Sequence, residues 1–142
     1  MDIVVKAYHY AYEKHGDTLD DIGKNYFKAH VCRVVSILYK VTDNDDILAA
    51  AYLHDVVEDC GVTYEELVKE FGKTIADLVM EVTHDGKKDN YGRYFPRLKT
   101  RDGVLIKFAD RLSNLSRMEA WDDKRQKQYV RKSKFWRDGS DK

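Results

Sequence analysis

The stretch Asp-Asp-Ile-Leu-Ala-Ala-Ala-Tyr-Leu-His-Asp-Val-Val-Glu-Asp, residues 45–59, joins an apolar segment directly to a cluster of ionisable residues. Residues 47–53 are all apolar or aromatic, and the two aspartates before them are candidate N-terminal caps, which predicts a helix buried on nearly every side. One histidine and three carboxylates follow at once: His54, Asp55, Glu58 and Asp59. Burying such groups is costly unless a cation or hydrogen bonds compensate, so the stretch indicates a functional site.

The spacing within this stretch suggests a division of roles. If the helix continues through it, His54 lies one turn from Glu58, and Asp55 lies one turn from Asp59. One pair can then hold a metal ion while the next turn handles a proton.

Length and composition limit the classes of protein to consider. A chain of 142 residues is long enough for one domain with a real core. Its 25 Lys and Arg balance its 25 Asp and Glu, so no net charge points to nucleic acid. No apolar run approaches the roughly 20 residues that span a bilayer, and neither a signal peptide nor a CxxC pair is present. We expect a cytoplasmic protein that binds neither membranes nor nucleic acid.

Apolar residues recur at helical spacing along most of the chain, and no stretch alternates as a half-buried strand does. The sequence therefore predicts an all-α fold with a single domain over residues 1–142. We expect helices over residues 3–14, 26–41, 47–53, 63–71, 75–82, 103–118 and 122–136, with a loop at 85–90 and a short helix at 91–98.

Two other predicted helices carry polar residues that can complete the site. His30 lies at the edge of an apolar face, where a single histidine is more often a core residue than a ligand. Asp110 and Asn114 lie one turn apart on the helix at 103–118. We expect its core-facing stripe to consist of Leu105, Phe108, Leu112 and Leu115. That arrangement puts Asp110 on the opposite edge, where it is either a ligand or a solvated acid that pairs with Lys107 or Arg111.

The order of these residues, His30, then His54-Asp55, then Asp110, resembles the HD superfamily of metal-dependent phosphohydrolases. In that superfamily a histidine, a His-Asp doublet and a distant aspartate bind one divalent metal ion. Residues 49–84, AAAYLHDVVEDCGVTYEELVKEFGKTIADLVMEVTH, resemble more narrowly the hydrolase domain of RelA/SpoT homologues and the small alarmone hydrolases. So do residues 104–115, VLIKFADRLSNL, which match the pattern Ile-Lys-x-x-Asp-Arg-x-x-Asn. The resemblance spans about residues 23–118, and Glu58-Asp59 is its most specific element.

The resemblance implies an HD-domain helical bundle and assigns a role to each position. The implied metal ligands are His30, His54, Asp55 and Asp110, and the implied catalytic carboxylates are Glu58 and Asp59. The implied substrate contact is Asn114, and Lys107 and Arg111 are further candidates. Lys24 or Lys28 can substitute for the basic residues that the family has before the first histidine. Such a mixed nitrogen and oxygen site suits manganese, iron or zinc, and the family implies manganese. Which of Glu58 and Asp59 acts on the water, and which on the leaving group, stays open.

The implied activity is removal of the 3′-pyrophosphate of guanosine tetra- or pentaphosphate, which gives GDP or GTP and pyrophosphate. The family usually places an Arg-Lys pair and then Gly-x-Pro-Tyr before the first histidine. Residues 19–30 here contain no arginine and no proline, and Phe27 stands where tyrosine is common. Another nucleotide substrate, such as a nucleoside monophosphate or an NADPH-like cofactor, therefore remains an alternative. A protein that sequesters a nucleotide without turnover is a third hypothesis, against which the pair of carboxylates argues.

Other charged or aromatic residues have two interpretations each. The basic stretch at 84–101 is either a solvated loop or a segment that covers the substrate. The basic and aromatic helix at 122–136 either packs on the core or binds single-stranded nucleic acid, and the zero net charge favours packing. We expect His9 and His15 to be surface residues.

Overall fold

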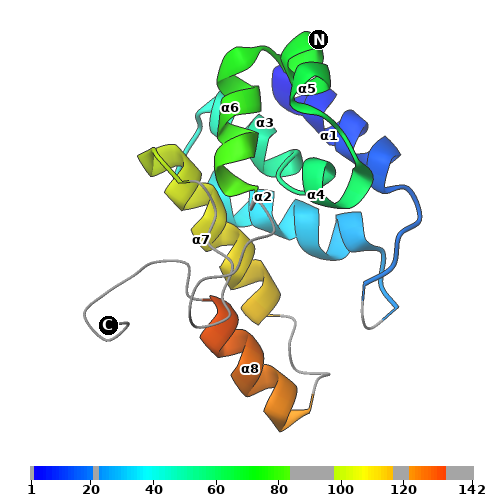
Figure 1. Cartoon of the computed structure of the whole chain (residues 1–142), viewed down its shortest axis with the longest axis vertical. Coiled ribbons are helices and arrows are strands. Elements are labelled where there is room, and N and C mark those ends of the chain that lie inside the picture. The colour runs from blue at the N-terminus through cyan, green and yellow to red at the C-terminus, as the bar shows by residue number, and fades with distance from the viewer. Residues whose placement is uncertain (1, 21–22, 84–97, 117–121, 134–142) are drawn as a thin grey trace.

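Helices make up nearly all the regular structure of this chain (Figure 1). A computed structural model describes residues 2–20, 23–83, 98–116 and 122–133, with only the backbone described for residues 131–133. The elements are α1 (Ile3–His15), the π-helix η1 (Phe27–Val31), α2 (Cys32–Tyr39), α3 (Asp45–Tyr52), α4 (Val56–Cys60), α5 (Tyr64–Phe71), α6 (Lys73–Val82), α7 (Arg101–Leu115) and α8 (Asp123–Ser133). Within these residues there is no strand, only an isolated bridge between Leu19 and Asn25. The predicted all-α fold is confirmed.

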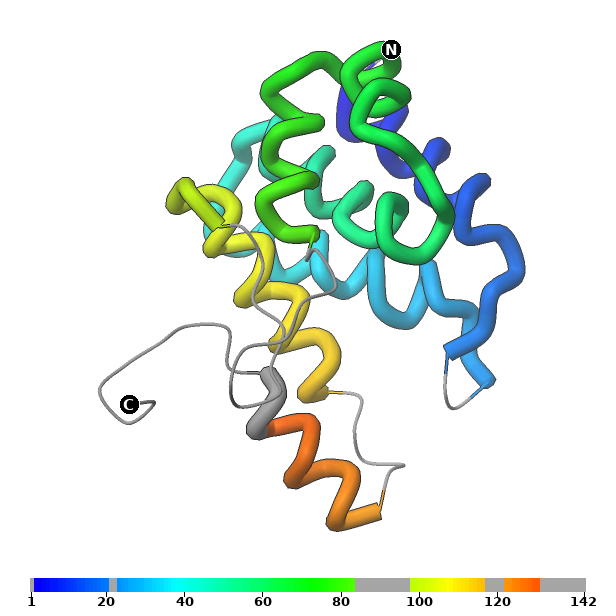
Figure 2. The backbone as a smooth tube through the Cα atoms, in the orientation of Figure 1, coloured from blue at the N-terminus to red at the C-terminus, as the bar shows by residue number. Residues whose placement is uncertain are grey.

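Helix α3 lies in the middle of the bundle, in contact with α1, α2, α6 and α7 (Figure 2). Residues 47–51 are all buried, as the apolar stretch predicts. Three of them are alanines, whose small side chains let the neighbouring helices pack close to the α3 backbone. The helix is thus enclosed on all sides, and its C-terminal end carries residues into the centre of the protein.

Helix α3 begins at Asp45, two residues before the predicted start, and its N-cap is also not the predicted one. Asn44, and neither Asp45 nor Asp46, is the N-cap, since its side-chain oxygen accepts from the backbone N–H groups of Asp46 and Ile47 at 2.9 and 3.2 Å. The two aspartates lie in the first turn instead, where their negative charge is favourable to the helix dipole.

The face of helix α7 that packs against the core is not the one predicted from its large apolar residues. Phe108 is 44% exposed and Leu112 is 53% exposed. The buried residues of α7 are Gly103, Ile106, Lys107, Ala109, Asp110 and Ser113. The prediction was therefore wrong for Phe108 and Leu112, whereas half-buried Leu105 packs against the core. The side chain of Asp110 points inward to meet residues of η1 and of the segment after α3.

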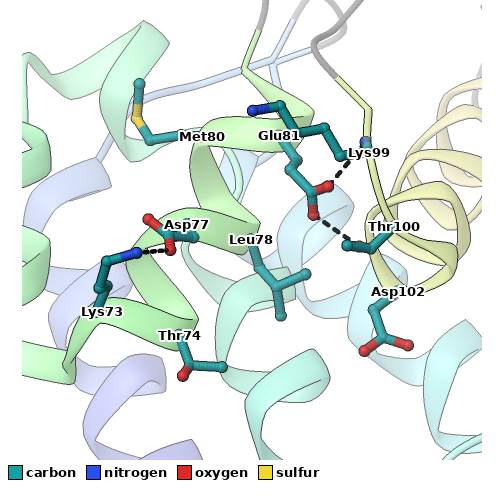
Figure 3. A pocket seen from close by; sticks show the side chains of 9 residues that line it. All are labelled: Lys73, Thr74, Asp77, Leu78, Met80, Glu81, Lys99, Thr100 and Asp102. Carbon is teal, nitrogen blue, oxygen red and sulfur yellow. Dashed lines mark hydrogen bonds and ion pairs between the residues drawn. The ribbon is translucent and has the colours of Figure 1, made fainter.

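The start of α7 is held against the end of α6 by the buried carboxylate of Glu81 (Figure 3). Its two oxygens accept from the backbone N–H of Lys99 at 2.8 Å and from the hydroxyl of Thr100 at 2.7 Å. Gly103 makes this approach possible, since a Cβ added there would lie 3.0 Å from Glu81 Oε2. The contact fixes the direction in which α7 leaves α6.

Helix α8 lies next to α7, at the end of the bundle farthest from α5 (Figure 1). The predicted loop at 85–90 and nearly all of the predicted helix at 91–98 lie outside the described residues, as does the end of the predicted C-terminal helix. No helix within the described part of the chain is long and apolar enough to cross a membrane.

The role of Glu81 in the fold is testable by Glu81→Leu. The variant leaves the Lys99 N–H and the Thr100 hydroxyl without this acceptor, so the free energy of unfolding should fall by about 1–3 kcal/mol in urea denaturation. Glu65→Leu, at an exposed position of α5, is the matched control and should change stability little. Equal losses in the two variants would contradict the role given to Glu81.

Candidate metal centre

Four predicted site residues from distant parts of the sequence meet in the interior of the protein. They are His30, His54, Asp55 and Asp110, and one ligand atom of each lies within 4.8 Å of the other three. Oδ1 of Asp110 lies 2.9 Å from Nε2 of His30 and 3.3 Å from Nε2 of His54. Oδ2 of Asp55 lies 3.0 Å from Nε2 of His54. Two imidazole nitrogens and two carboxylate oxygens therefore face one common point.

A break between α3 and α4 lets adjacent residues His54 and Asp55 point the same way. Leu53, with φ −95° and ψ 0°, and Asp55, with φ −105° and ψ −4°, adopt the bridge conformation, which is sparsely populated and occurs often in active sites. In an unbroken helix neighbouring side chains point about 100° apart, so the doublet would not converge. The chain therefore does not continue as one regular helix through residues 53–59, although Asp59 N–H still bonds to the carbonyl of Asp55 at 2.9 Å.

His30 comes from the π-helix η1 rather than from a regular α-helix. Such wider turns are rare and occur frequently at functional sites. The side chain of His30 is 1% exposed, so it is a buried residue of the centre and not an edge residue. Its second ring nitrogen, Nδ1, lies 3.0 Å from the hydroxyl of Ser113 on α7.

The hydrogen bonds around the two histidines fit a cation at this point. Nδ1 of His54 lies 2.7 Å from the carbonyl oxygen of Ala51, which can only accept, so this nitrogen carries the proton. A neutral His54 then turns the lone pair of Nε2 toward Nε2 of His30, 3.3 Å away, and toward the carboxylates. These atoms repel one another unless a proton or a metal ion lies among them. The pairing of Nδ1 with a carbonyl is also the usual outer contact of a metal-binding histidine.

The charges of the centre depend strongly on one another. Burial lowers the pKa of His54, but the charge of Asp55 and the hydrogen bond with Asp110 outweigh burial and hold it well above its ordinary value. Burial raises the pKa of both carboxyl groups, yet the neighbouring histidines keep both well below the ordinary value. Both aspartates are therefore ionised, as a metal ligand must be.

Two cations lie beside the second oxygen of Asp110. Nζ of Lys107 and a guanidinium nitrogen of Arg111 are each 3.5 Å from Oδ2. Lys107 is only 7% exposed, and Asp110 is 5% exposed. Asp110 thus pairs with these cations through one oxygen and with the histidines through the other, and it is not a solvated acid.

Glu58 and Asp59 lie on α4 with exposed side chains, next to the buried centre. Burial of part of the Asp59 carboxyl group, and then the charges of Asp55 and Glu58, raise its pKa to about 6. Asp59 can therefore exist both protonated and ionised near neutral pH. Such a group is suited to proton transfer.

Two of the remaining predicted substrate contacts, Asn114 and Lys24, lie within the described residues. Asn114 is half-buried on α7, one turn after Asp110. Lys24 is exposed in the segment before η1, where its backbone exchanges hydrogen bonds with Asp20. Residues 84–97 of the basic stretch at 84–101 lie outside the described residues.

Two residues near the centre were not assigned to the site from the sequence. The hydroxyl of Tyr26 donates to Oδ2 of Asp55, and burial and the Asp55 charge raise the pKa of this phenol well above its ordinary value. His15, expected at the surface, is 4% exposed; burial lowers its pKa, and its Nδ1 lies 3.6 Å from Sγ of Cys60. Their aromatic character alone did not distinguish them from packing residues.

A cavity of about 600 Å³ lies elsewhere, between α6 and the segment that leads into α7 (Figure 3). Its lining includes the Lys73–Asp77 ion pair and Glu81, but none of the predicted site residues. The cavity is therefore separate from the candidate metal centre.

Comparisons with known proteins match this chain to one family model and to several relatives. A family model described as an HD domain matches residues 7–92. MESH1 of Xenopus tropicalis, named as a guanosine-3′,5′-bis(diphosphate) 3′-pyrophosphohydrolase, is 31% identical over 141 residues, which cover 89% of this chain and 78% of that protein. A solved structure of a metazoan ortholog of SpoT that hydrolyses ppGpp has a TM-score of 0.78 and 29% identity, over 94% of this chain and 82% of that one.

The bacterial relatives are much longer. The pyrophosphohydrolase of Aquifex aeolicus (strain VF5) is 31% identical over 140 residues, which cover 92% of this chain but 20% of that protein. A probable pyrophosphohydrolase of Synechocystis is 29% identical, and 19% of it is covered. The chain thus spans about a fifth of the length of these two relatives.

The metal ligands can be tested by metal content. Wild type should bind about one equivalent of manganese, and both His54→Ala and Asp110→Ala should lose it, because each removes one of four donors. Elemental analysis after desalting measures the content. His9→Ala, at an exposed position of α1, should keep full content. Full metal content in both site variants would refute the assignment.

The raised pKa of Asp59 predicts that its ionised form destabilises the metal-free protein. A folded pKa of about 6, above the ordinary 3.8, makes the folded protein bind the proton more tightly. The resulting loss of folding free energy is complete above pH 6 and disappears as the pH falls below about 4. Asp59→Asn should therefore raise the melting temperature at pH 8, with a gain that shrinks toward pH 4. Asp43→Asn, at an exposed position, is the control. An equal gain in the melting temperature of Asp59→Asn at pH 8 and pH 4 would contradict the prediction.

Proposed function

Since the chain belongs to the HD domain family, as its resemblance predicted, we propose that it is a metal-dependent pyrophosphohydrolase that removes the 3′-pyrophosphate of guanosine tetra- or pentaphosphate. The observation that carries the proposal is the convergence of His30, His54, Asp55 and Asp110 beside the exposed carboxylates Glu58 and Asp59. Buried donors suit an ion, whereas exposed carboxylates are accessible to water and substrate. The relatives named above as 3′-pyrophosphohydrolases support the choice of substrate.

His30, His54, Asp55 and Asp110 would hold the ion, for which we propose manganese. A divalent ion at this position supplies Lewis-acid chemistry, which polarises a phosphoryl oxygen and lowers the pKa of a water molecule. The Ala51 carbonyl and the Ser113 hydroxyl hold the two imidazoles in place from behind. The centre is therefore organised before substrate arrives.

The two exposed carboxylates divide the proton transfers. Glu58 takes the proton from the attacking water, and Asp59 gives a proton to the ribose 3′-oxygen as pyrophosphate departs. The pKa of about 6 favours Asp59 as the donor, because the protonated form persists close to neutral pH. Spacing alone leaves this choice open, and the raised pKa of Asp59 supports the assignment that we propose.

Two cations beside Asp110, Lys107 and Arg111, are the groups near the centre that suit a phosphorylated substrate. Arg111 is half-buried and its guanidinium can reach a phosphate oxygen, whereas buried Lys107 acts through its charge. Asn114 and the exposed Lys24 are the proposed contacts to the rest of the nucleotide. A different nucleotide is the second candidate substrate, because residues 19–30 depart from the family pattern at the positions before His30.

The division of labour predicts that Glu58→Gln separates binding from turnover. The amide keeps the shape of the side chain but cannot accept the proton, so single-turnover hydrolysis should slow by about 10²-fold or more. Manganese content and nucleotide affinity, measured by calorimetry, should stay near wild type. Glu65→Gln on α5 is the matched control and should hydrolyse normally.

The substrate is tested by pyrophosphate and phosphate release over a panel of nucleotides in manganese. Guanosine tetraphosphate should be hydrolysed fastest. Faster release from another nucleotide would refute guanosine tetraphosphate as the substrate but would leave the assignment of the metal centre intact. Tight binding without hydrolysis of any nucleotide would favour the sequestering protein.

A further inference from the structure

Tyr26 contacts the oxygen of Asp55 that faces the centre. The Tyr26 hydroxyl donates to Oδ2, the same atom that lies 3.0 Å from Nε2 of His54 and 3.7 Å from Nε2 of His30. A carboxylate oxygen has two lone pairs, so Oδ2 can accept from the phenol and still face the position between the histidines. The hydrogen bond therefore acts on the atom that the ligand set uses.

The ring of Tyr26 is itself held in place. Its centroid lies 5.2 Å from that of His30 and 5.3 Å from that of His15. Its backbone N–H donates to the carbonyl of Thr18 at 2.8 Å, which ties the residue to the segment after α1. The tyrosine thus presents its hydroxyl from a fixed position.

We propose that Tyr26 is a positioning residue that holds Asp55 in its metal-binding orientation and thereby sets the affinity of the centre for a divalent cation. The inference rests on the proposed metal site and adds a residue that the resemblance does not assign.

The physical reason is pre-organisation. Asp55 belongs to the short turn between α3 and α4, whose side chains are not fixed by a regular helix on both sides. Without the phenol the carboxylate can rotate about its Cβ–Cγ bond, and this freedom must then be lost when an ion binds. Outer partners that orient metal ligands commonly change metal affinity by about 10- to 100-fold.

The test is manganese binding to Tyr26→Phe, which removes one oxygen and keeps the ring. The dissociation constant, from electron paramagnetic resonance of free manganese with metal-stripped protein, should rise by about 10-fold or more. Both proteins are compared at a temperature where circular dichroism shows each fully folded. Tyr8→Phe is the matched control, because its ring packs against Phe27 and Tyr52 in the same aromatic cluster.

The outcomes separate positioning from packing. Weaker manganese binding by Tyr26→Phe, with Tyr8→Phe like wild type, supports the proposal. Wild-type affinity in Tyr26→Phe overturns it, whether or not the melting temperature falls, because a packing role changes stability alone. If wild type itself binds no divalent cation, the proposed function fails at the metal site, a result distinct from failure of the role of Tyr26.

Discussion

The contacts of Asp110 with His30 and His54 join three segments that lie far apart in the sequence. Each contact takes charged or polar atoms out of water, which is unfavourable unless opposite charges and hydrogen bonds replace the solvent. Here Lys107, Arg111 and the two imidazoles surround the carboxylate of Asp110. The packing of η1, α7 and the end of α3 is therefore tied to the electrostatic balance of the centre.

The rest of the fold places these segments at the required distance. Alanines in α3 allow close packing by its neighbours, and the Glu81 contacts set where α7 begins. The π-helix and the break before α4 depart from regular helices, and both departures occur next to ligand residues. Irregular backbone thus occurs where side chains from different elements must converge on one point.

Burial divides the site into two parts with different chemistry. His30, His54 and Asp110 are buried, whereas Glu58 and Asp59 are exposed on the adjacent α4. A buried set of donors keeps its geometry, and an exposed pair can exchange protons with water and substrate. The same short stretch of sequence supplies both parts because the chain turns between them.

Helical periodicity in the sequence predicts the helical class, because it depends on local spacing. The motifs around His54 and Asp110 carry the resemblance, which implies the family and the candidate residues. The sequence did not determine the direction in which α7 faces. Its apolar pattern favours Phe108 and Leu112 as core residues, but the pairing of Asp110 with distant histidines turns the other face inward. The burial of His15 and the contact of Tyr26 with Asp55 become visible only in the folded protein. Both depend on residues that are remote in sequence, and spacing along one helix carries no information about them.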